Sequence, residues 1–179
     1  MPLLMLKDLP RYECLIEAAQ QFPDLDPSAC EAYLHLLRAG DDCFHVTEAN
    51  LLSQGLSPGR FTVLMLLLDK ATNLPAPHTP AELAERAGVT RATMTGLIDT
   101  LERDGLVKRE ADTVDRRMMD VSLTARGQEV LHAVLPGHFQ RMAALLSPLP
   151  ESERKTLVRL LNKVVQQAAE LRAAPAAAG

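Results

Sequence analysis

Tryptophan is absent from this sequence of 179 residues, and only two tyrosines and four phenylalanines are present. So few aromatic rings exclude the stacking platform on which many proteins bind single-stranded nucleic acids. The three cysteines, Cys14, Cys30 and Cys43, are an odd number without a close pair, so we expect no disulfide framework. The longest apolar run, Val63 to Leu68, is far shorter than the roughly 20 residues of a membrane-spanning helix. Since the first residues also lack a basic and apolar leader, we expect a cytoplasmic protein.

Acidic residues outnumber basic ones by 23 to 19, which gives a formal net charge of −4. This acidity is a weak argument against DNA binding, because exposed charges are screened beyond about 8 Å at physiological salt. The local placement of arginine and lysine therefore matters more than their total. With 47% apolar residues, the chain has the composition of an ordinary globular protein of one domain or two small ones.

Apolar residues recur at helical spacing over most of the chain, and proline, glycine and small polar residues mark the ends of the segments. Pro27 follows a capping aspartate and Pro58 follows Ser57, which are two signals for a helix start. The prolines between residues 73 and 80 exclude a helix there. We expect helices at about 12–21, 26–53, 58–71, 81–87, 91–104, 125–146 (interrupted at Pro136-Gly137) and 151–172.

The segment after residue 80 has the pattern of two helices joined by a tight turn. Gly88 ends the first helix, Thr90 caps the second, and the second carries an apolar stripe of Met94, Leu97, Ile98 and Leu101. This arrangement is typical of a helix-turn-helix. Strand-like patterns at 107–111 and 119–123 flank a charged loop. They predict a hairpin beside the helix-turn-helix, which is a wing.

The start of the second helix offers small polar and cationic side chains, which suit the major groove of DNA. The positive end of the helix dipole also favours phosphate there. A carboxylate beside an arginine in the wing loop can orient the guanidinium for a narrow minor groove. The candidate DNA contacts are Thr90, Arg91, Thr93, Thr95 and Gly96 on the helix, and Asp115, Arg116 and Arg117 in the wing. The alternative interpretation is a helix cap with solvated neighbours, and surface ion pairs worth about 0–1 kcal/mol.

Five segments resemble the MarR/SlyA family of bacterial winged helix-turn-helix regulators: Leu56–Leu64, Pro80–Arg103, Gly105–Val107, Asp115–Arg117 and Val121–Gly127. The resemblance covers about residues 30–172, and it implies a mainly α fold with a two-stranded β-wing. It also implies that the helix after the turn reads the major groove, while Arg117, held by Asp115, reaches the minor groove. Val114 departs from the pattern, since many members carry another arginine there.

The resemblance further implies a homodimer in which the first, fifth and sixth helices of both chains interlock. The chain would then consist of an N-terminal extension (1–27), a helical dimerisation region (28–56 and 124–172), a winged helix-turn-helix domain (57–123) and a flexible tail (173–179). The apolar stripe between Leu157 and Leu171 would find its partner in that dimer. Two-fold symmetry predicts a palindromic operator with half-sites about 10 to 10.5 base pairs apart.

Many members of the family release DNA when a small aromatic acid binds between the dimerisation helices and the DNA-binding lobe. An anion in an apolar cleft needs a fixed cation or other donors. Arg60, beside Phe61, is the first candidate, followed by Arg38 and His35, although such residues are more often solvated or in dimer contacts. The first 60 residues also resemble repressors of nicotinate degradation, whose inducer is a hydroxylated pyridine carboxylate. The resemblance thus favours a ligand-responsive repressor of an aromatic-acid catabolic pathway.

A thiol-redox sensor is the main alternative, because another branch of the family senses oxidants through a cysteine near the start of the first helix. That position falls on Tyr33 here, with Cys30 one turn earlier. We therefore expect all three cysteines to be small buried hydrophobic residues. We expect no metal and no cofactor, because His132 and His138 lie on different faces of a helix and the other histidines have no ligand cluster around them.

An enzyme and a winged helix that binds only protein are the rival classes. The sequence shows no glycine-rich phosphate loop, no nucleophile with a base and no pair of carboxylates. Binding rather than catalysis is therefore expected. A winged helix that binds only protein would keep its activity after loss of Arg117.

Overall fold

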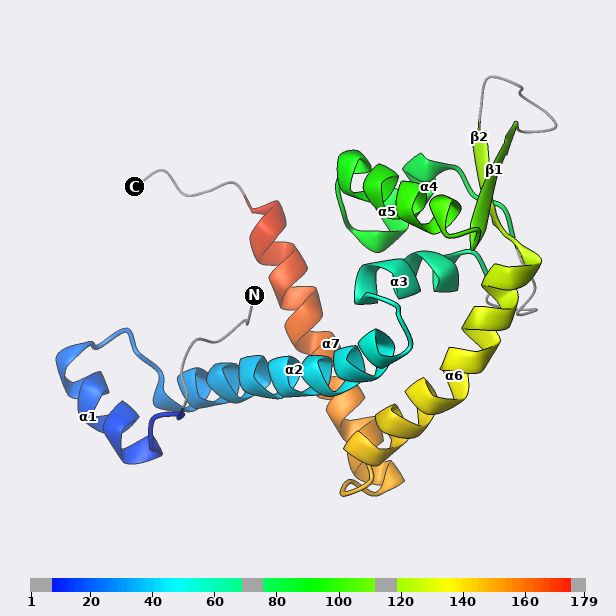
Figure 1. The fold of residues 1–179 in the computed structure, drawn as a ribbon. Coiled ribbons are helices and arrows are strands. Elements are labelled where there is room, and N and C mark those ends of the chain that lie inside the picture. Colours follow the sequence, from blue (N-terminus) through cyan, green and yellow to red (C-terminus); the bar gives the residue numbers. More distant parts are fainter. Residues whose placement is uncertain (1–7, 69–75, 112–118, 175–179) are drawn as a thin grey trace. The chain divides into compact units, whose positions relative to one another are not determined.

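The computed structural model describes residues 8–68, 76–111 and 119–174, and these are mainly helical (Figure 1). Within these ranges the helices are α1 (Tyr12–Gln21), α2 (Pro27–Ser53), α3 (Pro58–Leu66), α4 (Pro80–Ala87), α5 (Arg91–Arg103), α6 (Ala125–Leu145) and α7 (Glu151–Ala173). The strands are β1 (Val107–Ala111) and β2 (Met119–Leu123), which form an antiparallel sheet. The expected fold class is confirmed. No helix in these ranges is long and apolar enough to span a membrane.

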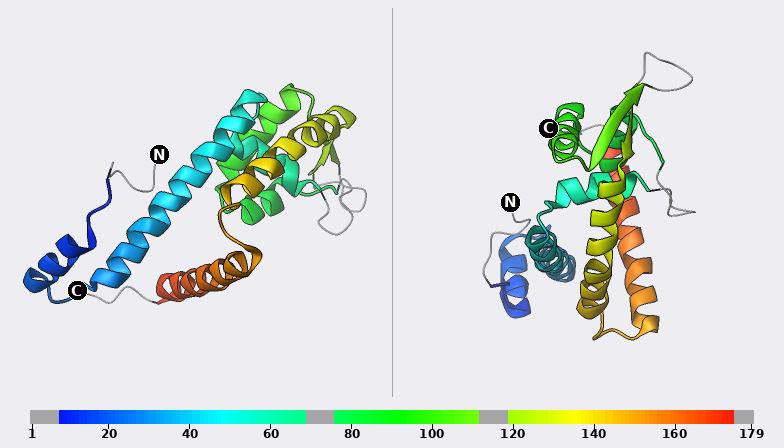
Figure 2. Two further views of the ribbon diagram at one scale, coloured as in Figure 1. Left: turned by 90° about the horizontal axis from the view of Figure 1, so that it is seen from below. Right: turned by 45° about the vertical axis from the view of Figure 1, so that its right-hand side comes forward.

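The first two helices lie side by side (Figure 2). α2 begins where the sequence predicts, because the Asp26 carboxylate accepts hydrogen bonds from the backbone N–H groups of Ser28 (2.9 Å) and Ala29 (3.1 Å). A hydrogen bond from the Ser28 hydroxyl, together with these amides, lowers the pKa of Asp26. The cap fixes the start of a 27-residue helix whose other end reaches the hydrophobic core at Leu51.

The main hydrophobic core lies where α3, α4, α5, the start of α6 and the hairpin meet the end of α2. α4, α5, α6 and the hairpin each contribute apolar side chains from one face, which is the pattern of amphipathic elements around one core. α3 is enclosed on several sides, since Phe61, Val63 and Leu64 are all buried. The side chains with no exposed surface include Val63, Leu64, Leu83, Met94, Ile98, Leu101, Val121 and Leu131. The core thereby holds α5 by its apolar stripe and leaves its opposite face to solvent.

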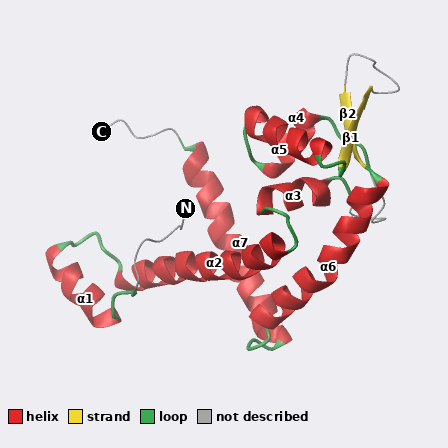
Figure 3. Ribbon diagram, viewed as in Figure 1, coloured by secondary structure: helices red, strands yellow, loops and turns green. Residues whose placement is uncertain are grey.

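Within the described residues, β1 and β2 form a hairpin (Figure 3), in which Val107 on β1 pairs with Leu123 on β2. His78, just before α4, adds a short bridge to the middle of β2. The His78 N–H donates to the Val121 carbonyl at 3.1 Å, and the Val121 N–H donates to the His78 carbonyl at 2.9 Å. The hairpin is therefore fixed to the start of the helix-turn-helix.

Two helices differ from the sequence prediction. α3 ends at Leu66 and does not continue toward residue 71, which lies outside the described ranges. It ends there because the Leu67 carbonyl accepts a hydrogen bond from the N–H of Ala76 (2.9 Å), a residue much later in the chain. α6 continues through Pro136 without the expected interruption. Proline removes one backbone donor, and this loss does not end the helix.

The chain forms two compact units, residues 1–139 and 140–179. The second unit contains α7, none of whose residues is buried in the single chain. Its most exposed large apolar side chains are Val158, Leu160, Val164, Val165 and Leu171. The division into extension, dimerisation region, winged domain and tail stays a prediction, and residues 175–179 of the tail lie outside the described ranges.

Candidate nucleic-acid interface

The turn between α4 and α5 is built from residues with local conformational preferences. Gly88 adopts the left-handed conformation (φ 65°) that a residue without a Cβ atom accepts most readily. Thr90 then caps α5, since its hydroxyl oxygen accepts a hydrogen bond from the N–H of Thr93 at 3.1 Å. Two of the signals identified in the sequence therefore set the direction in which α5 leaves the turn.

The first two turns of α5 present small polar groups and one cation to solvent. All five candidate contacts on this helix are exposed, namely Thr90, Arg91, Thr93, Thr95 and Gly96. A Cβ atom added at Gly96 would meet no atom within 4 Å, so the surface there is open. No acidic residue lies in the first turn. No carboxylate in the first turn of α5 therefore neutralises the positive end of the helix dipole.

A capping box, which the sequence analysis did not identify, fixes the start of α4. The N–H of Glu82 donates to the Thr79 hydroxyl oxygen (3.3 Å), and the N–H of Thr79 donates to the Glu82 carboxylate (2.8 Å). This second bond, with one from the Thr79 hydroxyl, lowers the pKa of Glu82. The Thr-x-x-Glu spacing is visible in the sequence, and it could have been found there.

Arg109 links the hairpin to α5. Its Nη2 atom lies 2.5 Å from the Asp99 carboxylate, its Nη1 atom pairs with Glu102, and its backbone N–H donates to Glu102 at 3.1 Å. The hydrogen bond with Asp99 is the largest cause of the raised pKa of Arg109. Because Arg109 is on β1 and both acids are on α5, these contacts hold hairpin and helix together. No local sequence signal marks this residue.

The wing loop itself is not among the described residues. Asp115, Arg116 and Arg117, and also Val114, lie between residue 111 and residue 119, in a segment outside the described ranges. The ends of β1 and β2 define where this loop leaves the sheet. Its contact with a minor groove stays a prediction.

The four candidate effector residues fall into two separate groups. Arg60 and Phe61 lie on α3; the Arg60 Nη2 atom forms an ion pair with Asp104, and Phe61 packs against the ring of His138 with centroids 4.7 Å apart. His35 and Arg38 are on α2, and His35 contacts the Glu31 carbonyl through Nδ1 (2.9 Å). At 1.5 Å per residue, His35 lies about 24 Å along the helix from the core at Leu51. The single chain therefore does not bring the two groups together.

His138 is a residue that the sequence analysis considered only as a metal ligand. Its Nδ1 atom is buried and has no hydrogen-bond partner. No group of three or more potential metal ligands occurs within the described ranges. His138 is therefore better described as part of the Phe61 contact between α3 and α6.

The cysteines do not have the expected environment. Cys14 and Cys43 are exposed and Cys30 is half-buried in the single chain. The expectation of three buried cysteines is therefore wrong for this chain by itself. It failed because Cys14 on α1 and Cys43 on α2 face solvent rather than the hydrophobic core.

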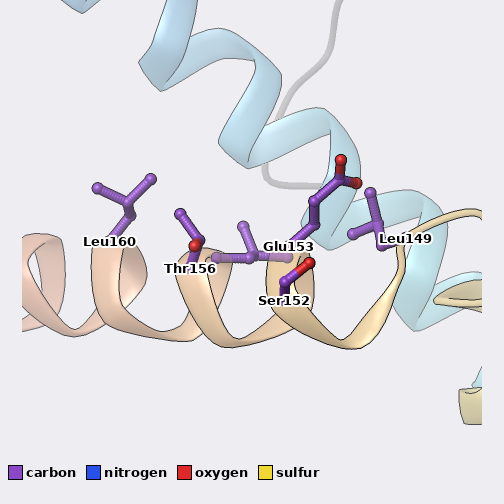
Figure 4. A pocket seen from close by; sticks show the side chains of 6 residues that line it. Leu149, Ser152, Glu153, Thr156 and Leu160 are labelled. Atoms are coloured by element: carbon purple, nitrogen blue, oxygen red, sulfur yellow. The ribbon is translucent and has the colours of Figure 1, made fainter.

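A pocket in the second unit lies along the first turns of α7 (Figure 4). Leucine, serine and threonine side chains and one carboxylate line it, from Leu149, Ser152, Glu153, Thr156, Leu157 and Leu160. None of these lining residues is a cation. It is therefore part of the exposed apolar face of α7 rather than a site for chemistry.

Two helices joined by a tight turn, a hairpin tied to them and an exposed polar helix face together define a winged helix-turn-helix DNA-binding protein. Residues 56–119 match the model of the MarR family. The chain is 36% identical to the HTH-type transcriptional repressor YetL of Bacillus subtilis, over 90% of this chain and 95% of that protein. The chain belongs to the MarR family.

Two solved structures share the fold. AbsC, a MarR family transcriptional regulator from Streptomyces coelicolor, has a TM-score of 0.70 and 22% identity, over 81% of this chain and 96% of that one. BpsR of Bordetella bronchiseptica, whose DNA binding is regulated by 6-hydroxynicotinic acid, has a TM-score of 0.63 and 23% identity, over 75% and 98% of the two chains. The protein is thus a transcriptional repressor of the MarR family rather than an enzyme. Regulators of this family bind DNA and small-molecule ligands, generally as dimers.

Proposed function

We propose that this protein binds a palindromic operator as a homodimer and leaves it when a small aromatic carboxylate binds. The two-sided character of α5 carries the proposal. Met94, Ile98 and Leu101 have no exposed surface, whereas the segment from Thr90 to Gly96 presents its polar side chains to solvent. A helix held in this way can enter the major groove without uncovering the core.

The exposed groups at the start of α5 have distinct roles in this proposal. Arg91 binds phosphate or a guanine edge, and the hydroxyls of Thr93 and Thr95 contact base edges, since threonine accepts and donates hydrogen bonds. Gly96 lets the backbone approach the groove closely. In the wing, Arg117 enters the minor groove with Asp115 as its orienting carboxylate and Arg116 at the phosphates.

The exposed apolar face of α7 supports the homodimer. Leu160 is 48% exposed, Val164 50% and Leu171 68%, and a helix with such a stripe needs a partner surface. We assign residues 28–56 and 124–172 to the dimerisation region and residues 57–123 to the DNA-binding domain. Residues 1–27 form an extension and residues 173–179 a tail. Two copies related by a two-fold axis would place two recognition helices on half-sites one turn of DNA apart.

The effector in this proposal is a small aromatic carboxylate from a catabolic pathway such as nicotinate degradation. BpsR has the same fold and is regulated by 6-hydroxynicotinic acid, which supports this chemical class without fixing the compound. Arg60 would supply the cation and Phe61 the apolar contact. Arg38 and His35 are the second choice, because they lie farther from the winged domain along α2.

Thiol oxidation is a second candidate signal, and the exposure of Cys14 and Cys43 favours it. An accessible thiol can react with an oxidant, whereas a buried one is protected. Replacing all three cysteines by serine separates the two signals. A response to carboxylate that survives in the serine variant supports the aromatic effector, and a response only to peroxide in the wild type supports the thiol.

Arg117→Ala tests the wing contact. We expect specific duplex DNA to bind about 1–3 kcal/mol more weakly, with dimerisation unchanged, because the arginine would lie in the groove and not between subunits. Fluorescence anisotropy with a labelled duplex measures the affinity, and light scattering measures the mass. Arg159→Ala, on α7 and far along the chain from the wing, is the control for loss of one charge. Equal DNA affinity of the Arg117 variant and the wild type would refute the wing assignment.

A further inference from the structure

A second pocket lies in the first unit, where the turn before α3, the end of α5 and the start of α6 meet. Its charged lining residues are three arginines and one aspartate: Arg60, Arg103, Arg126 and Asp104. Three positive charges against one negative charge leave an excess of two, although the whole chain carries a net charge of −4. Such a local concentration of positive charge attracts an anion.

The hydrogen-bonding capacity of these arginines is only partly used. Arg60 pairs with Asp104 through Nη2, and its Nη1 atom lies 3.5 Å from the Gly55 carbonyl oxygen. Its Nε atom is buried without an acceptor. The side chains of Arg103 and Arg126 make no hydrogen bond and no ion pair within the described part of the chain. A buried donor without an acceptor is destabilising, and a bound oxyanion would supply the acceptor.

We infer that this pocket binds the carboxylate group of the effector through Arg60, Arg103 and Arg126. The inference rests on the proposed ligand-responsive function and names the site at which the ligand acts. A guanidinium group presents its N–H donors in a planar fork that matches the two oxygens of a carboxylate. Leu56 and Leu106 also line the pocket, and they offer apolar contact beside the cations. His35 and Arg38 then have no part in binding the carboxylate.

The pocket is connected to the DNA-reading helix through Asp104, the residue at which α5 ends. Asp104 and the incoming carboxylate compete for the same cation, Arg60. Ligand binding therefore weakens the ion pair that joins the end of α5 to the start of α3. A ligand that binds better when this pair is open shifts the population toward that state. The recognition helix would then lose the position that matches its half-site.

The test measures binding to the full chain by titration calorimetry, at an ionic strength kept constant with chloride. The probes are benzoate, 4-hydroxybenzoate and 6-hydroxynicotinate, with benzamide as the uncharged analogue and inorganic phosphate as a second anion. Arg103→Gln and Arg126→Gln each remove one charge from an exposed side chain. Arg11→Gln removes the same charge before α1, also at an exposed position, and is the matched control.

We expect at least one carboxylate to bind wild type and Arg11→Gln equally, and to bind Arg103→Gln and Arg126→Gln about tenfold or more weakly. Asp104→Asn should bind it severalfold more tightly, because Arg60 is freed from its competitor. Damage to the fold would not produce such a gain. Melting curves without ligand establish that each variant is folded.

Unchanged carboxylate affinity in Arg103→Gln and Arg126→Gln would overturn the inference, and so would tighter binding of phosphate than of any carboxylate. If such a carboxylate still released DNA from those variants, the proposed function would stand and only the pocket would be wrong. If no carboxylate bound the wild type or released its DNA, the inference and the proposed effector class would fail together.

Discussion

The hydroxyl of Thr90 performs a structural task that is measurable without DNA. It accepts the hydrogen bond from the N–H of Thr93 that caps α5. Thr90→Ala removes this acceptor, and we expect a loss of about 1 kcal/mol in the free energy of unfolding. Urea denaturation followed by circular dichroism measures the loss. Thr90→Ser keeps the hydroxyl and is the control; a serine variant as unstable as the alanine variant would contradict the assignment of the cap.

Gly127 lies in the first turn of α6, against the turn that precedes β1. A Cβ atom at this position would lie 2.0 Å from the Leu106 carbonyl oxygen and 3.3 Å from the Leu123 side chain. Gly127→Ala therefore forces the backbone apart, and we expect a loss of about 1–3 kcal/mol in the free energy of unfolding.

Gly96→Ala is the opposite case, because a Cβ atom there meets nothing within 4 Å. An alanine in the interior of α5 should raise the free energy of unfolding by up to about 1 kcal/mol. Urea denaturation of both variants gives the comparison. If Gly127→Ala were as stable as Gly96→Ala, the close approach of α6 to Leu106 would be refuted.

Among the secondary-structure elements, β1 is connected to α5 by the side chain of Arg109. Its side chain is 24% exposed, while those of Asp99 and Glu102 are 57% and 38% exposed, so solvent screens these ion pairs. We expect Arg109→Met to lower the free energy of unfolding by about 1 kcal/mol and to speed amide exchange in β1. Hydrogen exchange followed by mass spectrometry measures the second effect.

Lys108→Met is the control on the same strand. Among the residues that the structure describes, the ammonium group of Lys108 pairs with Glu110 alone (2.7 Å), and both side chains are at least half exposed. We expect its free energy of unfolding to stay within about 0.5 kcal/mol of the wild type. Equal effects of the two substitutions would mean that Arg109 does not join hairpin and helix.

The sequence predicted those elements whose signals are local. Gly88 and Thr90 act on neighbouring residues, so the turn and the start of α5 could be located from them alone. The end of α3 could not, because it depends on a hydrogen bond between Leu67 and Ala76, which forms only when the later segment has folded back. Arg109 was missed for the same reason, since its partners lie seven and ten residues earlier in the chain.

The candidate sites show the same difference between signals from neighbouring residues and contacts between distant ones. The exposed face of α5 follows from helical periodicity, and its residues were named from the sequence. Arg60 was named as a cation beside an apolar cleft, but its pairing with Asp104 spans 44 residues. Arg103 and Arg126 come from two other elements, and only the folded chain brings them into the same pocket. The helical periodicity of a sequence does not predict which residues of different helices lie close together.

At the scale of the whole molecule, the apolar face of α7 needs a second copy of the chain in our account. Val164 is 50% exposed in the single chain. In a dimer whose interface includes this face, Val164→Glu would bury an unpaired charge. We therefore expect the variant to be largely monomeric at concentrations where the wild type is a dimer, as measured by light scattering after gel filtration.

Asn162→Asp adds the same charge about 160° around α7 from Val164, at an exposed position, and serves as the control. It should remain dimeric, because Asn162 lies on the side of the helix opposite the apolar stripe. Loss of the dimer should also weaken DNA binding strongly, since the two half-sites would then be bound independently. A Val164→Glu variant that stays dimeric would place the interface elsewhere on the chain.

Selection of duplexes from a random-sequence library on the purified protein, at low ionic strength, tests most directly whether α5 reads DNA as part of a dimer. We predict that the enriched duplexes contain an inverted repeat with half-sites about 10–10.5 base pairs apart, each duplex binding two chains. We also predict that Thr93→Ala or Thr95→Ala changes the selected bases. No enrichment, or enrichment of a single unrepeated motif by one chain, would contradict this account.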